Sequence, residues 1–92
     1  MEHQTAFEYR SLEEGAIILA SREGHVLDKV NVGSGKPVDE YLVARYAALL
    51  AAISETTGMM SGFGKPLEIE ATFSDTRLRI IVEDEVVRIL VE

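Results

Sequence analysis

Residues 38–57 read VDEYLVARYAALLAAISETT and predict a long helix with two apolar faces. Successive residues of a helix lie about 100° apart around its axis, so the large apolar side chains gather on one broad arc. They are Val38, Leu42, Val43, Tyr46, Leu49, Leu50 and Ile53. The opposite arc, called the alanine arc here, has Tyr41 at its edge and consists of Ala44, Ala47, Ala48, Ala51 and Ala52. Gly58 is expected to end the helix in a left-handed cap.

The two arcs predict two packing partners for this one helix. The large arc is wide enough to cover a sheet, whereas the alanine arc is smooth enough for another backbone to approach closely. A chain of 92 residues has little core of its own for a second face to enter. We therefore expect the alanine arc to meet another copy of the chain, and Ala48→Arg to dissociate the resulting dimer.

Length and composition predict one soluble globular domain covering residues 1–92. Nine Lys and Arg against 16 Asp and Glu give a net charge of −7, which disfavours nucleic acid and anionic membranes as partners. The chain has no cysteine, no apolar run of membrane-spanning length and no signal-peptide pattern at its N-terminus. These features favour a cytoplasmic protein without membrane insertion.

The segments before the long helix predict a short helix and two strands. Residues 5–8 fit a capping box, and a helix to about Glu14 would present Phe7, Tyr9 and Leu12. Residues 16–20 form an apolar run typical of a central strand buried on both faces. Alternating valines predict a second strand over residues 25–32.

The C-terminal third predicts a meander of three antiparallel strands whose registers can be tested. With tips at residues 74–75 and 84–85, apolar residues face one another across both hairpins. The predicted pairs are Phe73 with Thr76, Ala71 with Leu78, Ile69 with Ile80, Val82 with Val87, Ile80 with Ile89, and Leu78 with Val91. On the other face, Glu70 is expected to meet Arg79, and Thr72 to meet Arg77.

This order of elements resembles the roadblock family of dynein light chains and small-GTPase regulators. The resemblance rests on the apolar strand and acidic-Gly turn of residues 15–27, on the Ala- and Leu-rich helix, and on the meander. It implies an α+β, profilin-like fold: a five-stranded antiparallel sheet in the order 2-1-5-4-3 with the long helix on one face and, here, a short N-terminal helix. It also implies a homodimer that pairs the third strand edge to edge, which adds Leu67, Ile69, Ala71 and Phe73 to the expected interface.

Two expectations concern surfaces for a further protein partner. Ile18, Ile81, Val86 and Leu90 are expected on the sheet face away from the long helix, where the short N-terminal helix covers them either fully or only in part. The loop that carries Met59, Met60 and Phe63 either forms an adaptable contact surface or packs under the end of the helix.

Motifs for chemistry are sparse. Gly33-Ser34-Gly35-Lys36 lacks the spacing and the hydroxyl residue of a phosphate loop and indicates a flexible exit from a strand. His3 and His25 are too few and too far apart for a metal site, and no serine has an evident histidine partner. We therefore predict no catalytic, cofactor-binding or metal-binding residues.

Two classes of function fit the sequence. The first, implied by the resemblance, is a non-catalytic homodimeric scaffold or regulatory subunit that binds a small Ras-like GTPase or the subunits of a partner complex. The second is a profilin-like domain that senses or binds a small ligand. An internal pocket would favour the second class, but we expect the large side chains of the large arc to fill the core.

Overall fold

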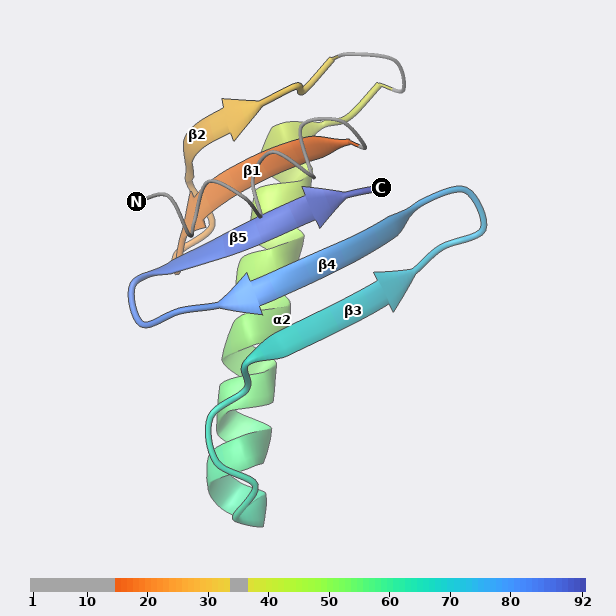
Figure 1. Cartoon of the computed structure of the whole chain (residues 1–92). Helices are drawn as coiled ribbons and strands as arrows, with labels where there is room; N and C mark the ends of the chain where they lie inside the picture. Colours follow the sequence, from red (N-terminus) through yellow and green to blue (C-terminus); the bar gives the residue numbers. More distant parts are fainter. Residues whose placement is uncertain (1–14, 34–36) are drawn as a thin grey trace, which may run out of the picture.

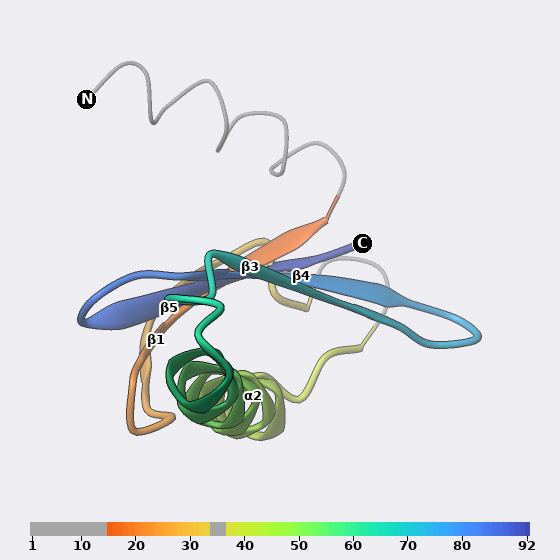
Figure 2. The same ribbon diagram turned by 90° about the horizontal axis from the view of Figure 1, so that it is seen from below.

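The computed structural model describes residues 15–33 and 37–92 as one sheet with a helix on one face (Figures 1 and 2). The strands are β1 (Ala16–Ser21), β2 (Val26–Val30), β3 (Glu68–Thr72), β4 (Arg77–Val82) and β5 (Val86–Val91), and the helix is α2 (Glu40–Ser61). All neighbouring strands are antiparallel, in the order β2-β1-β5-β4-β3. The predicted fold class and strand order are therefore confirmed, whereas the expected N-terminal helix lies outside the described residues.

The core lies between α2 and the facing side of the sheet. The sheet contributes the bulk, because its largest fully buried side chains are Ile18, Ile80, Val87 and Ile89. The helix contributes small residues, since Ala44, Ala47 and Ala51 are fully buried against this layer and Ala48 is nearly so. Short side chains let the helix backbone approach the branched residues of the sheet without leaving voids.

The expected roles of the two helix arcs were therefore wrong. The alanine arc packs on the sheet of its own chain, so Ala44, Ala47, Ala48 and Ala51 are not available to a second copy. Of the large arc, Val38, Val43, Tyr46 and Leu50 pack at the margin of the core, while the other three members face outward. These three are Leu42, Leu49 and Ile53. Ala48→Arg would accordingly disturb the fold of the single chain.

The helix also ends later than predicted. Gly62, at φ 74°, provides the left-handed cap, and the amides of Gly62 and Phe63 donate to the carbonyls of Met59 (3.4 Å) and Gly58 (2.8 Å) in a Schellman motif. Gly58 lies within the helix and serves close packing, because a Cβ there would fall 2.0 Å from the carbonyl oxygen of Gly64. The glycine that was predicted to cap the helix, Gly58, therefore has a different role, and Gly62 forms the cap.

The predicted registers of the meander are confirmed. β3 pairs Ile69 with Ile80, and β4 pairs Ile80 with Ile89. Glu70 lies opposite Arg79 as expected, yet the ion pairs run diagonally. Arg79 contacts Glu68 at 2.9 Å, and Arg77 contacts Glu70 at 3.3 Å. Long arginine side chains reach the diagonal neighbour across a sheet, so register alone did not determine the partner.

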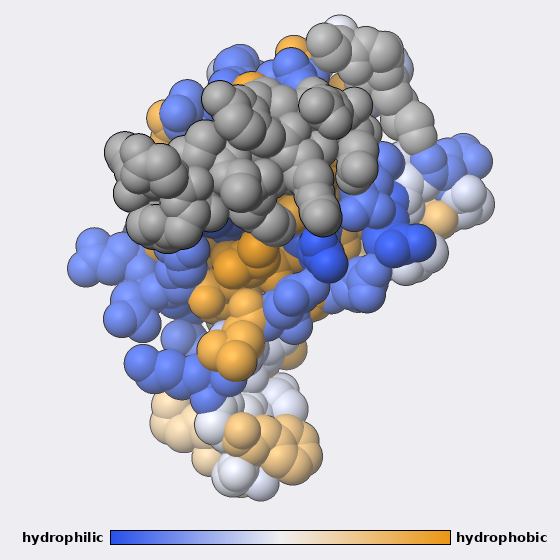
Figure 3. Space-filling model, viewed as in Figure 1, coloured by the Kyte–Doolittle hydropathy of each residue, from blue (hydrophilic) through white to orange (hydrophobic). Residues whose placement is uncertain are grey.

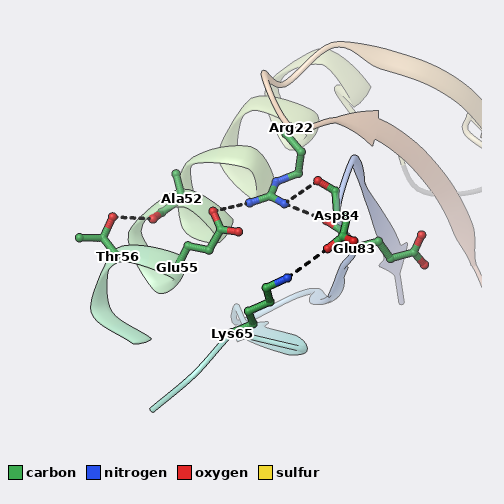
Figure 4. A network of polar contacts seen from close by, with 7 residues as sticks. All are labelled: Arg22, Ala52, Glu55, Thr56, Lys65, Glu83 and Asp84. Carbon is green, nitrogen blue, oxygen red and sulfur yellow. Dashed lines mark hydrogen bonds and ion pairs between the residues drawn. The ribbon is translucent and has the colours of Figure 1, made fainter. Parts of the chain in front are cut away.

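Two polar contacts join the helix to the sheet edges. Arg22, in the β1–β2 turn, contacts Glu55 of α2 at 2.7 Å and donates to the carbonyl oxygens of Glu83 (2.8 Å) and Asp84 (3.2 Å) in the β4–β5 turn (Figure 4). Lys29 of β2 pairs with Glu40 in the first turn of α2. The hydrogen bond that Lys29 donates to Glu40, together with the negative charge of Glu40, raises the pKa of Lys29 above its ordinary value.

We expect Arg22→Ala to lower the free energy of unfolding by about 1.5–3 kcal/mol, the usual range for hydrogen bonds to a charged group. The guanidinium of Arg22 joins three separate elements, and its side chain is only 19% exposed. Arg22→Lys keeps the charge but loses the planar fork, so it should restore only part of the stability. Urea unfolding followed by circular dichroism measures both variants, and equal stability of Arg22→Ala and the wild type would contradict this role.

Candidate interaction surface

The outward side of α2 carries a row of exposed apolar side chains, called the helix stripe here. It consists of Leu42, Leu49, Ile53 and Met60, which are 60–81% exposed. Leu42 and Met60 are 18 residues apart, or about five turns of 3.6 residues, so they point in the same direction from the helix. An apolar row of this length on a soluble helix indicates a surface that meets another molecule.

An apolar groove runs beside the N-terminal half of α2. Its volume is about 450 Å³, and it is lined by Pro37, Val38, Asp39, Leu42, Val43, Tyr46, Phe73, Thr76, Leu78 and Val91. The Tyr46 and Phe73 rings lie 6.0 Å apart at an angle of 56°. In Figure 2 the β3–β4 hairpin extends sideways past the helix, so the chain's own helix leaves this part of the sheet uncovered.

Strand β3 forms an open edge of the sheet, because among the described strands it pairs only with β4. Phe73 donates to the carbonyl of Thr76, and Val82 donates to that of Leu67. Backbone groups alternate in direction along an antiparallel strand. Glu68, Glu70 and Thr72 therefore direct their N–H and C=O groups toward the free edge, where a further strand could bind.

The C-terminal end of α2 projects beyond the β3 edge of the sheet (Figure 1). Three large apolar side chains at this end, Met59, Met60 and Phe63, are more than 75% exposed, as is Leu67 on the segment that leads into β3. Figure 3 shows the same end as a pale orange and white projection below a sheet face on which charged side chains border an apolar patch. The alternative that these residues pack under the helix end is therefore wrong, and the contact-surface interpretation stays a prediction.

The outer face of the sheet differs from the prediction at one strand. Ile18 points toward α2 and is fully buried in the core, whereas Ile17 pairs with Leu90 on the outer face. Leu90 is itself only 4% exposed, and Ile81 is half-buried. Ile18 is thus excluded as a partner-binding residue. The short helix expected to cover this face lies outside the described residues.

The structure brings together only some of the residues expected in a dimer. Tyr41, Ala52, Leu67 and Phe73 are exposed, and Ile69 and Ala71 lie half-buried on the edge strand. The sequence analysis missed the helix stripe, because it assigned Leu42, Leu49 and Ile53 to the arc that covers the sheet and Met60 to the loop after the helix. Only the exposure of Leu42, Leu49 and Ile53 in the folded chain reveals their role as surface residues.

The described residues offer little for chemistry. Nowhere in residues 15–33 and 37–92 do three or more His, Cys, Asp or Glu side chains gather as a possible metal site. Residues 34–36 of the glycine-rich segment, and His3, lie outside these ranges. No helix in the same ranges has both the length and the hydropathy of a membrane span.

Comparison with known proteins identifies the fold. No family model and no curated protein matches the sequence. Solved structures do match, among them structures of MglB and of a Roadblock/LC7 domain. A structure described as MglB with tetrameric arrangement has a TM-score of 0.75 and 20% identity, over 98% of this chain and 70% of that one. MglB from Myxococcus xanthus has a TM-score of 0.73 and 13% identity, over 89% of this chain and 66% of that one.

A Roadblock/LC7 domain from Streptomyces avermitilis has a TM-score of 0.74 and 15% identity, over 90% of this chain and 72% of that one. The chain therefore folds like MglB and the Roadblock/LC7 domains, which confirms at the level of the fold the resemblance seen in the sequence. At these identities the likeness establishes the architecture. Function has to be argued from the surfaces.

Proposed function

We propose that this chain is a non-catalytic, homodimeric scaffold or regulatory subunit that binds a small Ras-like GTPase or the subunits of a partner complex in the cytoplasm. The observation that carries the proposal is the position of the open β3 edge, the helix stripe and the apolar groove on adjoining parts of one small domain. Surfaces of this kind bind proteins, whereas the described residues contain no cluster suited to metal-dependent chemistry.

Homodimerisation through the β3 edge is supported by the free backbone groups of Glu68, Glu70 and Thr72. A second copy of β3 would satisfy these groups and continue the sheet. Symmetric pairing brings acidic side chains near one another. Arg79 and Arg77 already hold Glu68 and Glu70 in ion pairs, which reduces the repulsion between copies.

The partner protein would bind where the dimer leaves apolar side chains exposed. The best candidates are Met59 and Phe63 at the projecting end of α2, with Ile81 on the outer face as a weaker one. The choice of a small GTPase rests on the roadblock resemblance. The chain supplies binding surface and takes no part in catalysis in this proposal.

The test is a binding measurement with purified small Ras-like GTPases from the source organism, each loaded with GTP or with GDP. We expect at least one to bind, and Phe63→Glu to weaken that binding about tenfold or more because it places a charge in an apolar contact. Leu27→Glu is the matched control, since Leu27 is also exposed but lies on β2, at the opposite edge of the sheet. Failure of every GTPase to bind in either state would contradict this part of the proposal.

The apolar groove favours one alternative, a domain that binds a small apolar ligand. Its volume of about 450 Å³ lies within the usual size of ligand sites, and its lining is almost entirely apolar. The groove is, however, open along the side of the helix instead of enclosed. A ligand that co-purifies with the protein and is identified by mass spectrometry would favour this alternative.

A further inference from the structure

A second cleft lies between the β1–β2 turn and the N-terminal half of α2. Its volume is about 440 Å³, and it shares only Asp39 and Leu42 with the apolar groove. The turn side is lined by Gly24 and Val26, and the helix side by Tyr41, Leu42 and Arg45. The cleft lies beside β2, at the edge of the sheet opposite β3, so it is away from the proposed dimer edge.

Arg45 is the unusual side chain of this cleft. Every other Lys or Arg of residues 15–33 and 37–92 forms an ion pair, whereas Arg45 forms none within these ranges. The chain carries 16 acidic residues against nine basic ones, so a basic side chain without an acidic partner is unexpected. Its guanidinium keeps its charge at physiological pH and presents a planar fork that fits a carboxylate.

The surrounding sequence explains why Arg45 is unpaired. A helix places the residues three and four positions away closest to it, and none of these residues is acidic. The acidic residues at the start of α2 are already engaged, because Asp39 accepts the amide of Leu42 at 3.1 Å and Glu40 pairs with Lys29. The cleft therefore offers its positive charge to a ligand from outside the chain.

The β1–β2 turn holds the stem of Arg45 in place. A Cβ at Gly24 would fall 3.2 Å from the Cα of Arg45 and 3.3 Å from its Cγ, so the turn backbone packs directly on the helix at this point. Gly24 also has a φ of 94°, which favours glycine. Because the stem is held, less conformational entropy is lost when the guanidinium binds an acidic group.

We propose that the cleft binds an acidic segment of a protein partner, whose Asp or Glu carboxylate pairs with Arg45 while an adjacent apolar side chain packs on Val26 and Leu42. A carboxylate fits better than a phosphate, because Arg45 is the one Lys or Arg among the described lining residues and the carboxylate of Asp39 repels a doubly charged anion more strongly. The apolar part of the lining favours a peptide over a small free acid. The inference goes beyond the proposed function, since neither the second copy nor the GTPase is assigned to this cleft.

Selection from a random peptide library tests this site, with the purified wild-type chain as the target. We expect the enriched peptides to share an Asp or Glu next to an apolar residue, and the amide NMR signals of Gly24 and Arg45 to shift when such a peptide is added. Arg45→Gln keeps hydrogen-bond donors but removes the charge, and it should weaken binding of the selected peptide about fivefold or more. Arg77→Gln is the matched control, because it removes the same charge at an exposed arginine of β4 that is already paired with Glu70.

A second variant and competing anions separate the alternatives. Phe63→Glu should leave peptide binding unchanged, so a failure of the proposed GTPase contact and a failure of this site give different results. The proposal is overturned if no peptide is enriched, if the enriched peptides lack an acidic residue, or if Arg45→Gln binds them as tightly as the wild type. Succinate that bound as tightly as the selected peptide would overturn the choice of a peptide, and inorganic phosphate that competed more strongly than succinate would overturn the choice of a carboxylate.

Discussion

Ala47→Arg is expected to unfold the domain. Ala47 is fully buried between α2 and the sheet, with no room for a longer side chain and no acidic partner at that depth. An unpaired buried charge costs about 3–5 kcal/mol, and overpacking adds about 1–3 kcal/mol. A domain of this size typically has a total stability of about 5–15 kcal/mol, so the loss approaches the whole.

Circular dichroism and urea unfolding measure this effect at a protein concentration low enough to keep the chain monomeric. Ala52→Arg is the control, because it introduces the same side chain at an exposed alanine of the same helix. We expect Ala52→Arg to unfold at nearly the same urea concentration as the wild type. If Ala47→Arg stayed folded with wild-type stability, the alanine arc would not be the face that packs on the sheet.

A helical wheel cannot decide which of two apolar faces of a helix packs on the sheet, and the roles of the two arcs of α2 were exchanged for this reason. Periodicity identified both apolar faces of α2 correctly, yet it did not show which one the sheet covers. For the helix considered by itself, burying the larger side chains would remove the most apolar area from water. The sheet already supplies Ile18, Ile80 and Ile89, however, and close packing then selects the small helix residues. The choice depends on the combined volume of two elements far apart in the sequence.

Strand registers were predictable because alternation and turn position constrain each other. In the meander, apolar residues alternate with Glu70, Arg79 and Arg88, so a slip by one residue would bury charges. The β1 segment has no such alternation, since residues 16–20 are all apolar. Its phase was therefore not fixed by the sequence, and Ile18 was assigned to the wrong face.

The prediction of the contact surface at the end of α2 had a similar limit. The exposed methionines and Phe63 were recognised as a possible contact loop from their residue types and flanking glycines. Their exposure depends on the length of α2, which ends at Ser61 and carries them past the sheet. The helix reaches that length because it continues through Gly58, which packs against Gly64, to the cap at Gly62.

Glu70→Pro is expected to abolish the dimer while leaving the single chain folded. The N–H of Glu70 points to the free edge of β3, so proline there removes no hydrogen bond within the chain, and edge strands tolerate proline at such positions. In a dimer joined through β3, the same substitution removes a donor at the centre of the new strand pair and places the proline ring against the partner strand. Light scattering should report a monomer, with circular dichroism close to that of the wild type.

Ile69→Pro, one residue earlier, provides the opposite control. The N–H of Ile69 points toward β4, where the register pairs Ile69 with Ile80. Proline at that position removes a hydrogen bond inside the sheet and should lower the stability of the single chain, by about 3 kcal/mol or more if the cost resembles that in a helix interior. A dimer that survived Glu70→Pro would mean that a surface other than the β3 edge holds the two copies together. The β3 edge would then remain open for the partner protein, through addition of a strand from that protein.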